Sequence, residues 1–146
     1  MTKNKLRLEE FLPYKLSFLI NLISSDLAAL YTAEYGIAHT EWRVMAVLGI
    51  TSGVSAGYVA DKTAMDKVAV SRAINNMIKE GLIERKFSNE DKRRSELMLS
   101  KKGADIYEKI VPLVLNYEQD ILGALDQEEQ ETLTTILTKL TTYIQE

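Results

Sequence analysis

The chain has 146 residues, of which 46% are apolar and 27% charged, a composition typical of one folded domain or two small coupled lobes. It contains no cysteine, which excludes a disulfide framework, a thiolate zinc site and a cysteine nucleophile. The net charge of −3 is unevenly spread: residues 62–102 carry 11 positive and 6 negative side chains, whereas residues 103–146 carry 2 and 9. A local basic block can attract a phosphate backbone whatever the total charge, although a solvated lysine-rich face would have the same composition.

The first expected helix covers residues 9–35. Apolar residues recur along it at three- and four-residue steps, Pro13 lies near its start, and Gly36 is placed to end it in a left-handed conformation. Its most apolar part, residues 16–30, is interrupted by serine, asparagine and aspartate and is interpreted as too short and too polar to span a bilayer. The N-terminus lacks the apolar region of a signal peptide, so we expect a cytoplasmic protein that does not enter a membrane.

The next segment predicts helix, turn and helix. Thr40 is a good N-cap for a second helix, with Glu41 in the first turn, where the helix dipole favours an anion. A short third helix is expected over residues 55–62, followed by a turn at 63–65. Asp66 then caps a fourth helix that ends before Gly81.

The fourth helix is amphipathic. Its inward face is expected to hold Val70, Ala73, Ile74 and Met77, while the 3.6-residue period turns outward Val68, Arg72, Asn75 and Lys79, with Ser71 and Asn76 on the flanks. Arginine can bond guanine, and asparagine adenine, through two hydrogen bonds each in the major groove, so the outward face has the chemistry to read bases. An ordinary solvated helix would show the same periodicity.

A charged hairpin follows this helix. Residues 82–87 and 96–100 alternate as short strands do, around a polar tip at 88–95. The tip holds three consecutive cations, Lys92, Arg93 and Arg94, after Asp91. A narrow minor groove attracts an inserted arginine, and Asp91 could orient Arg93 through a charge-assisted bond. A solvent-exposed turn with a local ion pair is the alternative, but a cationic hairpin directly after a helix-turn-helix favours DNA binding.

Two further helices complete the chain. The fifth is expected over residues 101–123, with Pro112 inside it, where it should kink the helix or remove a hydrogen bond. Asp126, with Glu129 three residues later, resembles a capping box at the start of the sixth. The apolar stripes of the first, fifth and sixth helices exceed what one small lobe can cover, and we therefore expect a homodimer.

At this point the sequence resembles the MarR family of winged helix-turn-helix transcriptional regulators. Residues 66–85 (DKVAVSRAINNMIKEGLIER) resemble the family's recognition helix and first wing strand, and residues 91–94 (DKRR) resemble its Asp-x-Arg wing signature. Residues 99–103 and 37–48 are similar to the strand end and the second helix of the family. The resemblance implies a mostly α fold with a small β-hairpin wing, in which residues 1–36 and 101–146 form dimerisation helices and residues 37–100 form the DNA-binding lobe.

The resemblance also implies a function. A homodimer would bind a pseudo-palindromic operator in double-stranded DNA as a sequence-specific regulator, expected to be a repressor, and a small ligand of aromatic type would release it. Ser71 and Arg72 would contact DNA from the recognition helix, and Arg93 would enter the minor groove with Asp91 as its brace. The full set of expected DNA-binding residues is Ser55, Lys67, Ser71, Arg72, Asn75, Asn76, Asp91, Lys92, Arg93 and Arg94.

The chain departs from the family's pattern at two pairs of positions. Val68 and Ala69 stand where hydroxyl residues are common, which puts contacts at the start of the recognition helix in question. Asn75 and Asn76 stand where charged residues are common, so the operator sequence does not follow from the family.

Three other interpretations remain to be weighed. An enzyme is disfavoured, because His39 is the only histidine and the chain has no nucleophile motif, phosphate loop or metal-ligand spacing; no cofactor or metal is expected. A winged-helix module that binds only proteins, without an operator, is the alternative function, and the cationic tip argues against it. An effector site is also conceivable where the first, second and fifth helices meet, although plain core packing is favoured there; its candidate residues are Tyr31, Trp42, Arg43, Met45 and Tyr107.

Overall fold

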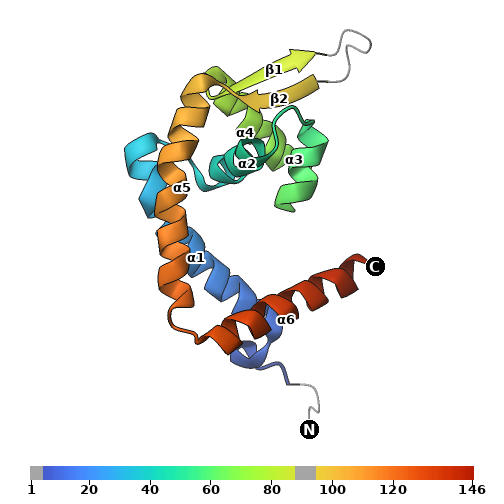
Figure 1. Cartoon of the computed structure of the whole chain (residues 1–146). Helices are drawn as coiled ribbons and strands as arrows, with labels where there is room; N and C mark the ends of the chain where they lie inside the picture. The colour runs from blue at the N-terminus through green and yellow to red at the C-terminus, as the bar shows by residue number, and fades with distance from the viewer. Residues whose placement is uncertain (1–4, 88–94) are drawn as a thin grey trace. The chain divides into compact units, whose positions relative to one another are not determined.

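A computed structural model describes residues 5–87 and 95–146 of the chain. The chain divides into two compact units, Met1–Ile110 and Val111–Glu146. The order of elements is η1 (Leu8–Glu10), α1 (Leu12–Tyr35), α2 (His39–Ile50), α3 (Ala56–Thr63), α4 (Lys67–Lys79), β1 (Ile83–Phe87), β2 (Ser95–Leu99), α5 (Lys101–Leu122) and α6 (Gln127–Gln145) (Figure 1). The predicted fold class, mostly α with one β-hairpin, is confirmed. The division into dimerisation helices and a DNA-binding lobe is a functional one and stays a prediction.

Local capping signals fixed most helix ends as expected. Gly36 ends α1 with φ 67°, in the left-handed region. The Asp66 carboxylate accepts a hydrogen bond from the backbone N–H of Ala69 at 2.9 Å and so begins α4. In the second unit, Asp126 and Glu129 bond each other's backbone N–H groups at 2.8 and 3.0 Å, which confirms the capping box of α6.

The predicted start of the second helix was wrong. Thr40 does not cap α2, which begins one residue earlier at His39, after Ala38. The Glu41 side chain reaches back and accepts a hydrogen bond from the backbone N–H of Ala38 at 2.9 Å. Because this bond comes from inside the helix, α2 can begin after a residue whose own side chain has no hydrogen-bonding group.

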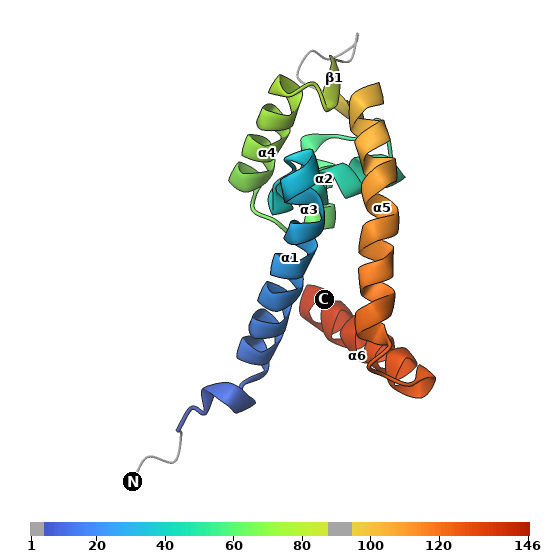
Figure 2. The same cartoon turned by 90° about the vertical axis from the view of Figure 1, so that its left-hand side faces the viewer.

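The core of the first unit lies among α2, α3, α4 and the hairpin. Figure 2 shows these elements clustered together, while the N-terminal half of α1 projects away from them. Tyr31 from the end of α1 and Ile110 from α5 are fully buried in this unit. The remaining buried apolar side chains come mainly from α2, α4 and the two strands and include Val44, Met45, Leu48, Val70, Ile74, Met77, Leu82, Ile83 and Leu97.

The hairpin is tied to the helix-turn-helix by a third short pairing. β1 and β2 are antiparallel, with Ile83 opposite Leu99 and Phe87 opposite Ser95. On the other side of β2, Leu97 donates to the carbonyl of Val54 at 2.7 Å and accepts from Gly53 at 2.9 Å. The segment just before α3 therefore pairs with the middle of β2.

The helix α1 is longer than the apolar stretch considered from the sequence. It has 24 residues, and by length and composition alone it could cross a membrane. Length and composition are weak evidence for a span, because core helices of soluble proteins and signal sequences meet the same criteria.

Both units carry apolar side chains that the chain itself leaves exposed. On α1 they lie in the N-terminal half and include Leu12, Leu16, Phe18, Leu19, Ile20 and Leu22. On α6 they are Leu133, Ile136, Leu137, Leu140, Tyr143 and Ile144. The helix α5 continues through Pro112 without interruption.

Candidate nucleic-acid interface

The helix-turn-helix is formed by α3, a short turn and α4. Ser55 caps α3, since its Oγ accepts from the backbone N–H of Tyr58 at 3.0 Å, and the side chain is therefore engaged at the helix start. The turn passes through Ala64 at φ 54°, a left-handed conformation that is uncommon for a residue with a side chain. Val59 and Ala60 are buried and hold α3 in the core beside α4.

The predicted inward and outward faces of α4 are confirmed. Val70, Ala73, Ile74 and Met77 are buried, whereas Val68 is 66% exposed. A shallow hollow of about 410 Å³ on the outward side is lined by Lys67, Val68, Ser71, Arg72 and Asn75. The four polar members of this set are all exposed, so the structure leaves them available for an external partner.

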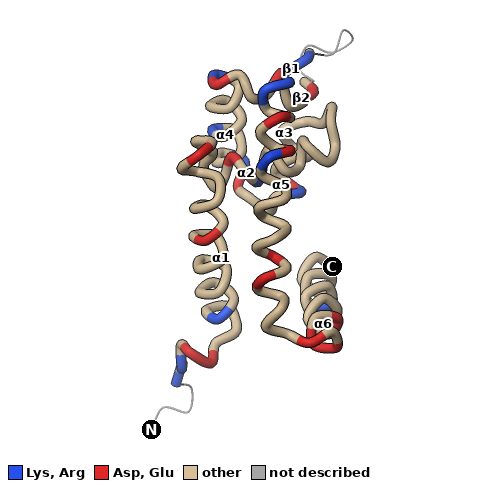
Figure 3. Tube along the Cα trace, turned by 60° about the vertical axis from the view of Figure 1, so that its left-hand side comes forward, with Lys and Arg blue, Asp and Glu red and all other residues tan. Residues whose placement is uncertain are grey.

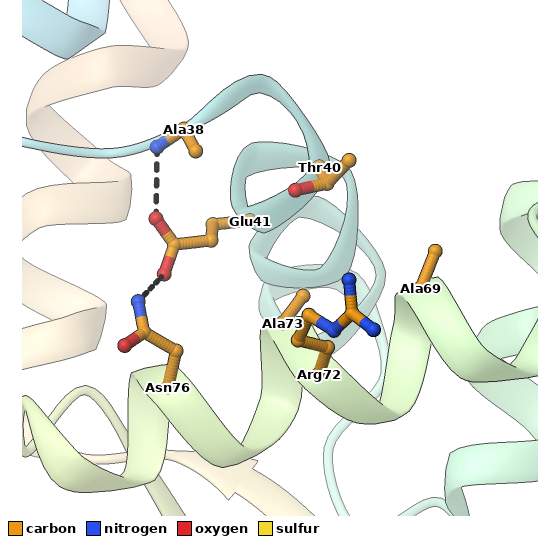
Figure 4. Close-up of a pocket in the computed structure, with 7 residues that line it drawn as sticks. All are labelled: Ala38, Thr40, Glu41, Ala69, Arg72, Ala73 and Asn76. Carbon is orange, nitrogen blue, oxygen red and sulfur yellow. Dashed lines mark hydrogen bonds between the residues drawn. The ribbon is translucent and has the colours of Figure 1, made fainter.

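Arg72 lies at the edge between this outward face and a second hollow. The second hollow, of about 460 Å³, lies between the start of α2 and α4 and is lined by Ala38, Thr40, Glu41, Ala69, Arg72, Ala73 and Asn76 (Figure 4). Within residues 5–87 and 95–146, the guanidinium of Arg72 has no carboxylate partner. A guanidinium without a carboxylate partner is suited to a phosphate or a guanine edge.

Asn76 is placed differently from its neighbour Asn75. Its Nδ2 donates to Oε2 of Glu41 at 2.8 Å (Figure 4). It donates more weakly to Oε1 of Glu80, at 3.4 Å. Glu41 is only 4% exposed. The sequence analysis assigned Glu41 to the helix dipole and missed this link, and no local sequence signal connects two residues that are 35 positions apart.

The hairpin brings two further cations toward the interface. Arg85 and Lys86 on β1 are exposed, and Phe87 is 61% exposed. Figure 3 shows lysine and arginine on α4 and β1. The sequence analysis treated Arg85 and Lys86 only as strand residues, although two adjacent cations before a cationic tip were a usable signal. Four expected DNA contacts, Asp91, Lys92, Arg93 and Arg94, lie outside the described residues.

Charge differs sharply between the two units. Residues 111–146 carry 1 positive and 7 negative side chains, and Figure 3 shows acidic residues at the start of α6. A surface of this sign repels a phosphate backbone. The electrostatics therefore favour the first unit for any contact with nucleic acid.

The expected effector residues form a packed aromatic column. The Trp42 ring lies 5.6 Å from Tyr31 and 6.0 Å from Tyr107, centroid to centroid, and is nearly parallel to both. A side chain at Gly49 would collide with the Tyr107 ring, so this glycine allows the column to form. Met45 is fully buried, and Arg43 is half-buried. Three of the expected residues, Tyr31, Trp42 and Tyr107, therefore pack against one another.

His39 lies in the same region, and its hydrogen bond is to a core side chain, Tyr31. Its Nδ1 lies 2.8 Å from the hydroxyl of Tyr31, and its Nε2 is buried without a hydrogen-bond partner in the described part of the chain. Burial, and then the charge of Arg43, lowers the pKa of His39, which keeps the ring neutral at pH 7. Burial raises the pKa of Tyr31 to about 12, with Arg43 opposing the shift.

Comparison with known proteins identifies relatives in one family. A family model described as MarR family matches residues 35–94. The chain is 31% identical over 93 residues to the HTH-type transcriptional regulator BilQ of Clostridium symbiosum, a match that covers 64% of this chain and 65% of that protein. The chain thus spans slightly less than two thirds of this relative.

Solved structures extend the similarity to the whole chain. A MarR/EmrR family transcriptional regulator from Acinetobacter sp. ADP1 has a TM-score of 0.88 and 27% identity, covering 96% of this chain and 99% of that one. Two more distant structures share the fold. One is Bordetella bronchiseptica BpsR, whose DNA binding is regulated by 6-hydroxynicotinic acid; it has a TM-score of 0.84 and 18% identity, covering 94% of this chain and 98% of that one. The other is S. aureus MepR in complex with DNA, with a TM-score of 0.76 and 22% identity, covering 87% of this chain and 96% of that one.

The fold, the matched segment and the relatives point to the same kind of protein. The matched residues 35–94 contain the helix-turn-helix, β1 and the segment after it. The relatives are described as transcriptional regulators, not as enzymes. The chain is similar to MarR family transcriptional regulators in fold and, over residues 35–94, in sequence.

Proposed function

We propose that the protein is a sequence-specific transcriptional regulator that binds a pseudo-palindromic operator in duplex DNA as a homodimer. The observation that carries this proposal is the outward face of α4. It presents the hydroxyl of Ser71, the guanidinium of Arg72 and the carboxamide of Asn75 on one exposed side of a helix. A helix of this size fits the major groove, where these groups can distinguish base pairs.

The other expected contacts have supporting roles. Ser55 and Lys67 lie at the starts of α3 and α4, where backbone N–H groups and the helix dipole favour a phosphate. Arg85 and Lys86 add positive charge on β1. We assign Arg93 to the minor groove, with Asp91 as its brace and Lys92 and Arg94 beside it, on the strength of the sequence. The bound duplex in the S. aureus MepR structure supports use of this fold on DNA.

The exposed apolar rows on α1 and α6 support a homodimer. A monomer that exposed so many large apolar side chains would be prone to association. A second copy of the chain is the simplest partner that could bury these side chains. We therefore assign residues 1–36 and 101–146 to dimerisation and residues 37–100 to DNA binding.

Sedimentation tests the dimer. At micromolar concentration the protein is expected to sediment with the mass of two chains. Ile136→Glu, which places a charge in the apolar row of α6, is expected to shift this mass toward one chain, because an unpaired charge opposes burial in an apolar interface. Thr135→Glu, an exposed neighbour outside the row, is the control and should remain dimeric. A folded wild-type monomer at this concentration would refute the dimer.

Selection from random duplex DNA tests operator binding. The protein is expected to enrich one pseudo-palindromic sequence. If it makes six or more phosphate contacts, its affinity for that sequence should fall by about a thousandfold or more between 50 and 200 mM salt. A scrambled duplex of the same length serves as the control and should bind more weakly at every salt concentration. A winged-helix module that binds only proteins would enrich no sequence, and that result would favour the alternative function.

Repression, ligand release and a cytoplasmic location are further parts of the proposal. Support for a ligand comes from BpsR, whose DNA binding responds to 6-hydroxynicotinic acid. In this chain, Arg43 beside the column of Tyr31, Trp42 and Tyr107 has the chemistry to hold a planar aromatic acid. Because those rings are stacked, a ligand would have to part them. Adding such acids to the operator assay tests this part, since an unchanged affinity would exclude release.

A further inference from the structure

The two adjacent asparagines of α4 differ in what their carboxamides can still bind. A carboxylate only accepts hydrogen bonds, so the Nδ2 of Asn76, not its oxygen, must face Glu41 and Glu80, at 2.8 and 3.4 Å. These two contacts use both hydrogens of that amide. Asn75 is exposed, and within residues 5–87 and 95–146 its carboxamide has no partner.

The partner of Asn76 cannot easily be released. Glu41 is 4% exposed, and the hydrogen bonds to its carboxylate come from Asn76 and from the backbone N–H of Ala38. If Asn76 turned toward DNA, a buried carboxylate oxygen would lose its donor, which is strongly unfavourable away from water. The bond is therefore expected to persist in the DNA-bound protein.

The same carboxylate connects α4 to the junction between α1 and α2. Ala38 lies in this junction, next to the fully buried Ile37. The carbonyl of Ile37 accepts a hydrogen bond from Thr32 at the end of α1, at 2.7 Å. Glu41 thus joins the start of α2 to the last turn of α4, while Thr32 ties the end of α1 to the same junction. Together these contacts are expected to limit how α4 can rotate.

These contacts give the two asparagines different roles toward DNA. Reading adenine through two hydrogen bonds requires a donor and an acceptor from one carboxamide, and Asn76 has only its acceptor left. We propose that Asn76 is a positioning residue that, with Glu41, fixes the orientation of α4, and that Asn75 is the carboxamide that reads adenine. The proposal rests on the proposed operator binding, and it removes Asn76 from the base-reading residues expected from the sequence.

A reversal of the hydrogen bond tests the positioning role. Asn76→Asp places two carboxylates face to face and is expected to lower the ratio of folded to unfolded protein by roughly tenfold or more, read from urea unfolding at one protomer concentration. Glu41→Gln combined with Asn76→Asp restores a donor opposite an acceptor, keeps the bond to Ala38 and keeps the net charge. This double variant is expected to regain part of the loss, because its carboxylate at position 76 still faces Glu80, to which Asn76 donates in the wild type. Asn75→Asp is the matched control and should change the ratio by less than about threefold.

Sequence selection with the same proteins tests the reading role. The wild type and the double variant are expected to enrich the same sequence, whereas Asn75→Ala should lose its adenine preference at one position in each half-site. The positioning role is overturned if the double variant is no more stable than expected from adding the effects of Glu41→Gln and Asn76→Asp measured singly. The reading role is overturned if the double variant selects a different base from the wild type while Asn75→Ala selects the same base as the wild type. A wild type that enriches no sequence overturns the proposed function and the reading role with it, while the urea measurements still report the Glu41–Asn76 bond separately.

Discussion

Replacing Gly103 with alanine is expected to lower the free energy of unfolding by about 3 kcal/mol, a large effect for the addition of one methyl group. Gly103 is buried in the first turn of α5, and a Cβ there would overlap the carbonyl oxygen of Leu82. Backbone atoms cannot rotate aside as a flexible side chain can.

The surrounding hydrogen bonds make this contact rigid. Ser100 donates from its backbone to Leu82 at 2.9 Å and from its hydroxyl to the carbonyl of Gly81 at 2.6 Å. The Ser100 hydroxyl also accepts from the backbone N–H of Gly103 at 3.0 Å. These bonds hold the start of α5 against the start of β1, so relief of the overlap would require that several of them break.

Urea unfolding measures the effect, and Gly57→Ala is the control. A Cβ at Gly57, inside α3, would meet only Ser55 Oγ at an ordinary 3.7 Å. Alanine is the better helix former by up to about 1 kcal/mol, so Gly57→Ala should be neutral or slightly stabilising. Equal stability of the two variants would show that the approach of α5 to β1 is not as close as described.

Arg72→Ala is expected to weaken operator binding by about 1–3 kcal/mol for each half-site, and thus by about 2–6 kcal/mol for a dimer that uses both copies. The guanidinium is exposed on the outward face of α4 and has no carboxylate partner in the described part of the chain, so it is free to make two hydrogen bonds to one guanine. Loss of these bonds should relax the base preference at that position as well as the affinity.

Fluorescence anisotropy with the selected operator and with single-base variants of it measures both effects. Arg72→Lys keeps the charge but loses the planar fork, and it should lose base preference more than affinity. Lys109→Ala removes the same charge from α5 and controls for the change in net charge. An Arg72→Ala protein with unchanged affinity and preference would remove Arg72 from the interface.

The features that could be predicted from the sequence are those that depend on near neighbours in the chain. Gly36, Asp66 and Asp126 each act on a backbone within a few residues, and all three mark helix ends as predicted. The inward face of α4 followed from its 3.6-residue period. The prediction that Thr40 caps α2 was wrong because Glu41, a residue of the same helix, accepts the hydrogen bond from the backbone N–H of Ala38 and lets the helix begin earlier.

The features that could not be predicted depend on contacts between distant segments. The bond between Glu41 and Asn76 joins α2 to α4, and the column around Trp42 joins three helices. Periodicity can place a residue on a face, but it cannot say which polar groups on that face are already hydrogen-bonded. For this reason both Asn75, on the outward face, and Asn76, on its flank, were expected to contact DNA.

The pairing of Val54 with Leu97 has a consequence for how the protein would measure DNA. Because the middle of β2 is hydrogen-bonded to the segment that leads into α3, and both α3 and β1 pack against α4, we expect α4 and the two strands to move as one piece. On the proposed function, the spacing between the bases met by α4 and the stretch of duplex beneath the hairpin is then constant. The protein would therefore also select sites by the geometry of the duplex. A site with the correct bases but a different local rise or twist would fit either α4 or the hairpin, but not both at once.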